Sequence, residues 1–186
     1  MGTVLGVDEQ GFLVPRADAA AMQSPWREAV ADLADRYSTA ADGHGLYVRG
    51  SVATGTAVPG ISDLDYIVLL SRPVDEELLD AWDADLAVAH PGVGKVDRLD
   101  IGWQGDVVGL SQPIAFLLTC QSAWVSGQDI TSLLPRFAPG RATRLNCRGF
   151  DDWLTGRLEK LGGRPFTSRR GGRLYVDDEV AAARGV

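Results

Sequence analysis

Apolar side chains recur at intervals of three and four residues in the segment SPWREAVADLADRYSTA, residues 24–40. This spacing places them on one face of a helix, and that face is expected to pack inward. Ser24 is of a type that caps helices, and Pro25 suits a first helical turn. The segment therefore predicts an amphipathic helix, whose buried face consists of Trp26, Ala29, Val30, Leu33 and Tyr37.

Two short apolar runs that read as strands follow this helix. They are LYVR, residues 46–49, and LDYIVLL, residues 64–70. The second run is almost continuous, which is typical of a strand that is buried on both faces. Because the residues between the runs are rich in glycine and other small types, the predicted local order is helix, strand, loop and strand.

The second half of the chain predicts further helices and one more strand. VDEELLDAWDADLAVAH, residues 74–90, reads as a helix with acidic residues in its first turn. GKVDRLDIGW, residues 94–103, is a candidate strand, and residues 112–125 and 150–161 are expected helices. The buried stripe expected in the helix of residues 74–90 consists of Leu78, Leu79, Trp82 and Leu86.

Length and charge limit the classes of function that remain. The chain has 186 residues, of which 45% are hydrophobic, enough for one sizeable domain, alone or with a short appendage. Its formal net charge of −7 gives no general attraction for nucleic acid and favours cationic partners or metal ions. A nucleic-acid partner would therefore need a local basic patch.

Cysteine usage and the N-terminal sequence indicate the compartment. Two cysteines are too few for a disulfide framework, and two histidines leave little scope for a histidine-rich metal site. The first residues lack a basic leader followed by an apolar run, and no window approaches the roughly 18 apolar residues of a membrane span. The sequence therefore predicts a cytoplasmic protein without a membrane partner.

Asp63 and Asp65 stand two positions apart at the head of the second apolar run. In a strand, side chains at positions i and i+2 project from the same face, so the two carboxylates are expected side by side. Such a pair suits magnesium, which takes oxygen ligands in a tight octahedron. Upstream, Gly50 has no side chain to keep a phosphate from the backbone, and Ser51 offers a hydroxyl and an amide.

A simpler interpretation exists for each motif alone. PGISD could be a turn whose aspartates bind the local backbone, and Arg49 could form a surface ion pair or reach a phosphate or a site carboxylate. The joint order of strand, Gly-Ser, connecting segment and Asp-x-Asp at the head of a buried strand favours the functional interpretation.

The segment YVRGSVATGTAVPGISDLDYIVLL resembles the signature of the nucleotidyltransferase superfamily. That superfamily includes DNA polymerase beta, aminoglycoside nucleotidyltransferases and minimal nucleotidyltransferases of toxin–antitoxin systems. The resemblance covers about residues 46–103. It implies an α/β (α+β) fold, in which a mixed sheet is flanked by helices; the rest of this chain adds a short helical C-terminal region, where many relatives have a larger one. It also implies magnesium-dependent transfer of a nucleoside monophosphate from a nucleoside triphosphate to an acceptor hydroxyl.

Carried over position by position, the resemblance implies that Gly50 and Ser51 hold the triphosphate. Asp63 and Asp65 would bind the metal, with two magnesium ions expected. The family also has a third catalytic carboxylate on a later strand, for which Asp97 and Asp100 are candidates. Because these two residues differ in parity, only one of them can face the pair in a regular strand. We expect Asp97 to be the third catalytic and metal-binding residue, with Asp100 as the alternative.

The expected organisation is a catalytic domain over residues 1–108 and a short helical region with a tail over residues 109–186. Many relatives build the acceptor pocket from a larger helical region. In this protein a second subunit or a partner protein could complete the acceptor pocket. The acceptor is expected to be a small molecule such as an aminoglycoside, or a protein or RNA hydroxyl. The alternative is a non-catalytic or partner-dependent module of the antitoxin type.

Overall fold

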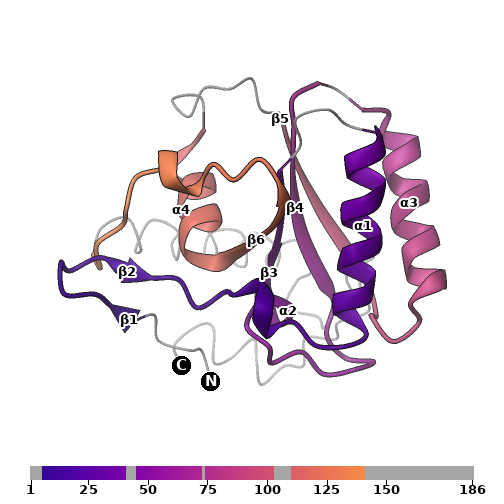
Figure 1. Ribbon diagram of the computed structural model, residues 1–186, viewed down its shortest axis with the longest axis horizontal. Helices are drawn as coiled ribbons and strands as arrows, with labels where there is room; N and C mark the ends of the chain where they lie inside the picture. The colour runs from indigo at the N-terminus through magenta and orange to yellow at the C-terminus, as the bar shows by residue number, and fades with distance from the viewer. Residues whose placement is uncertain (1–5, 41–44, 73, 103–109, 141–186) are drawn as a thin grey trace, which may run out of the picture. The chain divides into compact units, whose positions relative to one another are not determined.

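A four-stranded mixed sheet forms the centre of the computed structural model, which describes residues 6–40, 45–72, 74–102 and 110–140 (Figure 1). The strand order is β5-β4-β3-β6. β3 (Gly45–Arg49) runs antiparallel to both β4 (Leu64–Leu70) and β6 (Ser122–Gly127), whereas β4 and β5 (Val96–Gly102) are parallel. The mixed sheet that the resemblance implies is therefore present.

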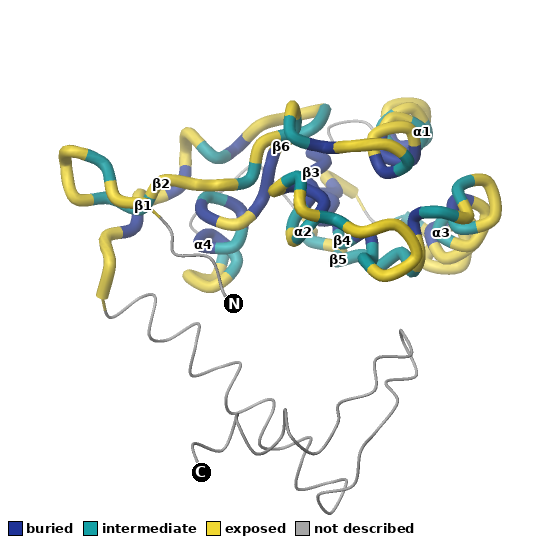
Figure 2. The backbone as a smooth tube through the Cα atoms, turned by 90° about the horizontal axis from the view of Figure 1, so that it is seen from below, coloured by how far each residue is buried: buried dark blue, intermediate teal, exposed yellow. Residues whose placement is uncertain are grey.

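Two helices lie on one face of this sheet, α1 (Trp26–Ala40) and α3 (Glu76–Ala89) (Figure 2). Alternate residues of β4, from Leu64 to Leu70, join the hydrophobic core on this face. The predicted apolar face of the first helix is confirmed, since all five of its residues are buried in this core.

The stripe predicted for α3 is wrong at one position. Leu79 and Leu86 are buried, but Leu78 is 43% exposed. Adjacent residues of an α-helix point about 100° apart, so Leu78 and Leu79 do not share one narrow buried stripe.

A second layer lies on the other side of the sheet, where α4 (Gln112–Gln121) is found (Figure 1). Ile67 and Leu69 of β4 alternate with the residues that face α1 and α3, so their side chains point to the other face of the sheet. They are fully buried there as well. Phe116 of α4 packs edge to face against Phe137, with ring centroids 5.2 Å apart. The expectation of a strand buried on both faces is confirmed for β4.

The helix predicted over residues 112–125 ends early. α4 stops at Gln121, and β6 begins at Ser122. The Ser122 hydroxyl donates a hydrogen bond to the Leu117 carbonyl oxygen, and Trp124 and its neighbours pair with the free edge of β3. Pairing across the sheet, which local periodicity does not report, decides the conformation of this segment.

Smaller elements complete the described residues. The segment after β3 was expected to be a loop, but it begins with the one-turn helix α2 (Gly50–Ala53). β1 (Gly6–Val7) and β2 (Leu13–Val14) form a small hairpin, and two 3-10 turns are η1 (Ala19–Ala21) and η3 (Thr131–Leu133).

Two further observations concern the extent of the chain. The residues from Met1 to Pro139 belong to one compact unit and those from Gly140 to a second unit. The helix expected at residues 150–161 lies outside the described residues. None of the helices in the described ranges is long and apolar enough to cross a membrane.

Candidate functional site

Gly50 forms the turn where β3 ends and α2 begins. Its φ angle is +71°, and a Cβ at this position would lie 2.9 Å from an Asp65 carboxylate oxygen. Both the backbone conformation and the lack of space favour glycine here. The turn is closed by a hydrogen bond of 2.9 Å from the Thr56 amide to the Ser51 carbonyl oxygen. Gly50 therefore lies directly beside the carboxylate of Asp65.

Register brings two of the predicted carboxylates together. Asp65 of β4 and Asp97 of β5 are direct partners in the parallel pair, so they lie on the same face of the sheet. Asp63 immediately precedes β4, and its charge acts on Asp65 together with that of Asp97. The structure therefore gathers Asp63, Asp65 and Asp97 in one neighbourhood.

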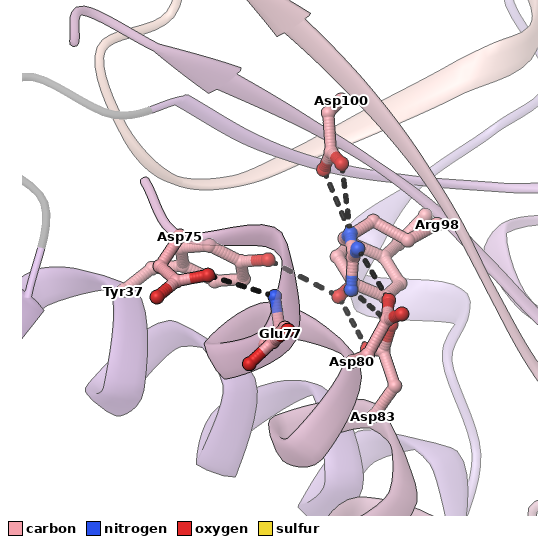
Figure 3. A network of polar contacts seen from close by, with 8 residues as sticks. Tyr37, Asp75, Glu77, Asp80, Asp83, Arg98 and Asp100 are labelled. Carbon is pink, nitrogen blue, oxygen red and sulfur yellow. Dashed lines mark hydrogen bonds and ion pairs between the residues drawn. The ribbon is translucent and has the colours of Figure 1, made fainter. Parts of the chain in front are cut away.

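Asp100, the alternative third carboxylate, lies elsewhere. It is the register partner of Val68, whose side chain belongs to the core under α1 and α3. There Arg98 forms an ion pair with Asp100 at 2.8 Å, and the same guanidinium also pairs with Asp80 and Asp83 of α3 (Figure 3). Asp100 is thus on the opposite face from Asp65.

Two basic residues accompany the carboxylates. A guanidinium nitrogen of Arg49 lies 3.4 Å from an Asp65 oxygen, and the Lys95 ammonium lies 2.9 Å from Asp97. Burial raises the pKa of Asp65, and the charges of Asp97 and Asp63 raise it further, whereas Arg49 and Lys95 lower it. The net effect is a raised pKa, so Asp65 holds its negative charge in an unfavourable environment.

The donor set fits a hard divalent cation in its chemistry. Carboxylate oxygens are the ligands that magnesium prefers, and a cation would relieve the repulsion that raises the Asp65 pKa. In the orientations that the structure describes, however, no three His, Cys, Asp or Glu side chains converge as a metal-binding group. Asp65 and Asp97 are instead turned to Arg49 and Lys95, which a metal ion would have to replace as partners.

A cavity of about 360 Å³ adjoins the Gly-Ser turn. Its volume is in the range of small-ligand sites. Arg49 and Gly50 line this cavity and also neighbour Asp65, so the cavity adjoins the carboxylates. The residues that line it are Arg16, Ala17, Arg49, Gly50, Ser51, Thr54, Thr56, Cys120 and Gln121.

The family assignment comes from comparison of the sequence with known protein families. The profile of the nucleotidyltransferase domain matches residues 27–127, more than half of the chain. The chain belongs to this family. The matched range extends from α1 to the end of β6 and includes Gly50, Ser51 and all three predicted carboxylates.

Solved structures that resemble this nucleotidyltransferase domain include toxin–antitoxin complexes. A chain of the MntA–HepT complex is 14% identical, with 73% of this chain and 96% of that chain covered and a TM-score of 0.39. A structure of a tri-AMPylated Shewanella oneidensis HEPN toxin with its MNT antitoxin is 14% identical, with 73% and 95% covered and a TM-score of 0.39.

A spectinomycin adenyltransferase from Enterococcus faecialis, solved with ATP and spectinomycin, is 16% identical. The match covers 72% of this chain and 68% of that one, with a TM-score of 0.46. The comparison with curated proteins found no match. Membership of the nucleotidyltransferase family therefore rests on the domain match.

Sequence reasoning missed two basic residues of the site, Lys95 and Arg16, and left the role of a third, Arg49, open. The β3–β4 register places Arg49 directly opposite Asp65. Lys95 stands two positions before Asp97, a spacing that could have suggested the pair. Arg16 lies before the matched family range, and no local pattern connects it with Gly50.

Proposed function

We propose that this nucleotidyltransferase domain is a magnesium-dependent enzyme that moves a nucleoside monophosphate from a nucleoside triphosphate to an acceptor hydroxyl. The observation that carries the proposal is the meeting of the Gly50 turn with Asp65 and, through the β4–β5 register, with Asp97. Phosphoryl transfer of this kind needs little covalent chemistry from the protein, which mainly positions the reactants and stabilises charge. A glycine turn beside clustered carboxylates can serve both tasks.

The residues of the chain have distinct tasks in this proposal. The Ser51 hydroxyl and the backbone of the Gly50 turn bind phosphate oxygens of the donor. Asp63, Asp65 and Asp97 would hold magnesium, which supplies Lewis-acid stabilisation of the phosphoryl oxygens when it is bound. Arg49, already in contact with Asp65 and with the cavity, orients the phosphate chain at the boundary between them.

The bond changes follow from this placement. The acceptor oxygen forms a bond to the α-phosphorus, and the bond from that phosphorus to the bridging oxygen breaks, which releases pyrophosphate. We assign Asp97 as the base that takes the hydroxyl proton, because it lies beside Asp65 at the edge strand of the described sheet. Asp63 and Asp65 would hold the magnesium that positions the donor phosphates.

The acceptor belongs to one of three classes: a small molecule, a protein or an RNA. The net charge of −7 favours a cationic small molecule over RNA, because an acidic protein repels a polyanion and attracts a cation. Catalytic carboxylates act on any hydroxyl that is positioned beside them, so the walls of the site determine the specificity.

The direct test is incubation with α-labelled nucleoside triphosphates, magnesium and acceptors from each class. We expect labelled acceptor and an equal amount of pyrophosphate, and we expect Asp65→Asn to abolish both. Asp35→Asn is the matched control, because Asp35 is an exposed carboxylate on α1 far in sequence from the site. Failure to label any acceptor with any nucleotide, at concentrations that saturate binding, would contradict the proposal.

A further inference from the structure

The segment before α1 is attached to the turn that follows the Gly-Ser motif. The Asp18 amide donates a hydrogen bond of 2.8 Å to the Ala53 carbonyl oxygen, and the Gln23 side chain donates one of 3.2 Å to the Gly55 carbonyl oxygen. Gly55 has a φ of +67°, and a Cβ there would lie 2.8 Å from the Ala21 carbonyl oxygen. The two segments therefore approach each other more closely than most side chains would permit.

This attachment places Arg16 at the cavity. Arg16 and Ala17 line the same space as Gly50 and Ser51, and Asp18 is the next residue along the chain. Asp18 also caps the η1 turn, where its side chain accepts a hydrogen bond of 2.8 Å from the Ala20 amide. The backbone on the C-terminal side of Arg16 is thus held by a cap and by the contact with Ala53.

The polar groups around the cavity suit an anion. Arg16 is exposed, and within the described part of the chain it has no hydrogen-bond or ion-pair partner. The other charged lining residue, Arg49, has a buried Nε without a partner among the described residues. Thr54 and Thr56 add hydroxyls, which share a hydrogen bond of 2.9 Å, and the lining contains no carboxylate. An anionic ligand would find hydrogen-bond donors among the lining residues, and the neighbouring carboxylate, Asp65, is paired with Arg49.

We propose that Arg16 binds the terminal phosphates of the donor nucleoside triphosphate, from a segment that precedes the family's matched range at residue 27. The proposal rests on the proposed function. The carboxylates and Gly50 mark the end of the site where the phosphoryl group is transferred, and Arg49 marks its junction with the cavity. The phosphates beyond that junction extend into the cavity, where a guanidinium binds two phosphate oxygens with parallel hydrogen bonds.

The position of Arg16 also predicts a role in product binding. The β- and γ-phosphates that it contacts leave together as pyrophosphate, so the same residue should hold the product. A nucleoside monophosphate lacks these phosphates and should not depend on Arg16. Inorganic tripolyphosphate carries the phosphate chain without a nucleoside and therefore isolates the contact.

The experiment is calorimetric titration of the full chain, in magnesium, with a nucleoside triphosphate, the corresponding monophosphate and inorganic tripolyphosphate. We expect Arg16→Gln to weaken the triphosphate and tripolyphosphate about 10- to 100-fold, as for loss of hydrogen bonds between charged groups. Binding of the monophosphate should be unchanged. Arg16→Lys should restore part of the loss, because it keeps the charge but not the planar fork.

Arg136→Gln is the matched control, because it removes the same charge at a half-exposed arginine that pairs with Asp8 in the small hairpin. It should bind all three ligands as the parent does. An equal loss in this control would show a general charge effect and overturn the assignment. A loss that is as large for the monophosphate as for the triphosphate would overturn the placement at the terminal phosphates.

The remaining outcomes separate this inference from the proposed function. If Arg16→Gln binds all three ligands as the parent does while Asp65→Asn loses the triphosphate, the inference fails and the function stands. If the parent chain binds neither the triphosphate nor tripolyphosphate, both fail. A kinetic comparison adds a further check, since Arg16→Gln should raise KM for the triphosphate and leave kcat within about twofold.

Discussion

Asp65 is the residue in which the demands of folding and of the proposed chemistry conflict. Its carboxylate is largely buried, receives the charges of Asp63 and Asp97, and has Arg49 as its close basic partner at 3.4 Å. A folded protein tolerates such a group only where the rest of the structure holds it in place. Residues of this kind are frequent at functional sites, because a ligand with positive charge makes the same arrangement favourable.

The first prediction concerns Asp65 and pH. Because its pKa is raised in the folded state, the native protein holds the proton more strongly than the unfolded chain does. The contribution to stability is then fully present below the unfolded pKa of about 3.9, and it is lost as pH rises through the folded pKa. We expect Asp65→Asn to be more stable than the parent at pH 7 and to lose this advantage near pH 4.

Urea unfolding at the two pH values measures this effect in the absence of metal. Asp35→Asn, on the exposed surface of α1, should show no comparable difference between the two pH values. An Asp65→Asn variant that is less stable than the parent at pH 7 would show that the ion pair with Arg49 outweighs burial and repulsion.

The second prediction concerns Ser51. Replacing Ser51 by Ala removes a hydroxyl from the cavity without a change in charge or a loss of core packing. We expect activity to fall about 10- to 100-fold, which corresponds to about 1.5–3 kcal/mol for hydrogen bonds to a charged group. Steady-state kinetics and a melting curve measure the change, and the melting temperature should stay the same. An unchanged rate and affinity would mean that the turn does not contact the triphosphate.

The third prediction separates Asp97 from Asp100. Asp97→Asn should lose nearly all transferase activity, because Asp97 is the register partner of Asp65. Its stability should change little, since loss of the partly exposed Lys95 pair is offset by relief of repulsion at Asp65. Asp100→Asn should stay active and lose some stability, because Asp100 is a partner of Arg98. Activity assays and unfolding curves of both variants decide the matter, and a reversed pattern of activity would make Asp100 the third carboxylate.

At the scale of elements, β5 and α3 are joined by a buried cation. The Arg98 side chain of β5 is 7% exposed and pairs with Asp80 at 2.9 Å, with Asp100 at 2.8 Å and with Asp83 (Figure 3). The Tyr66 hydroxyl of β4 donates a hydrogen bond of 2.6 Å to Asp83. Burial alone would lower the pKa of Arg98, but the three carboxylates raise it, so the guanidinium stays charged. Since Asp97 precedes Arg98, these contacts hold the strand that carries the proposed third carboxylate.

The fourth prediction tests this junction. Arg98→Met leaves the mostly buried carboxylate of Asp83, 18% exposed, without its cation, so we expect a loss of about 3–5 kcal/mol in the free energy of unfolding. The double variant Arg98→Met with Asp83→Leu removes both charges and should recover part of that loss. Urea denaturation measures both changes. A loss below about 1 kcal/mol in Arg98→Met would show that Asp83 is relieved by water or by protonation.

At the scale of the whole molecule, charge determines the conditions for nucleotide binding. The chain has a net charge of −7 and a nucleoside triphosphate is itself an anion, so the two repel each other at long range. The fifth prediction is that the triphosphate binds at least 10-fold more tightly with magnesium or manganese than with a chelator. Calorimetry in the two buffers measures the difference. Equal affinities in the two buffers would exclude a metal role for the carboxylates in binding.

Several features of the fold were determined by the sequence alone. The buried face of α1, from Trp26 to Tyr37, and the bounds of β4, from Leu64 to Leu70, agree with the prediction. Both depend on the periodicity of neighbouring residues, which the sequence displays directly. The nucleotidyltransferase family was also predictable, because Gly-Ser and Asp-x-Asp occur within one short segment in the order that the family requires.

Tertiary structure decided the features that depend on partners far away in the chain. Residues 122–125 form a strand because the edge of β3 is open to them, and Asp97 lies opposite Asp65 because β4 and β5 pair in that register. Arg16 reaches the cavity because the segment after it is bonded to Ala53. Periodicity and spacing describe only neighbours along the chain, whereas these contacts arise from the packing of separate elements, so no local pattern contains them.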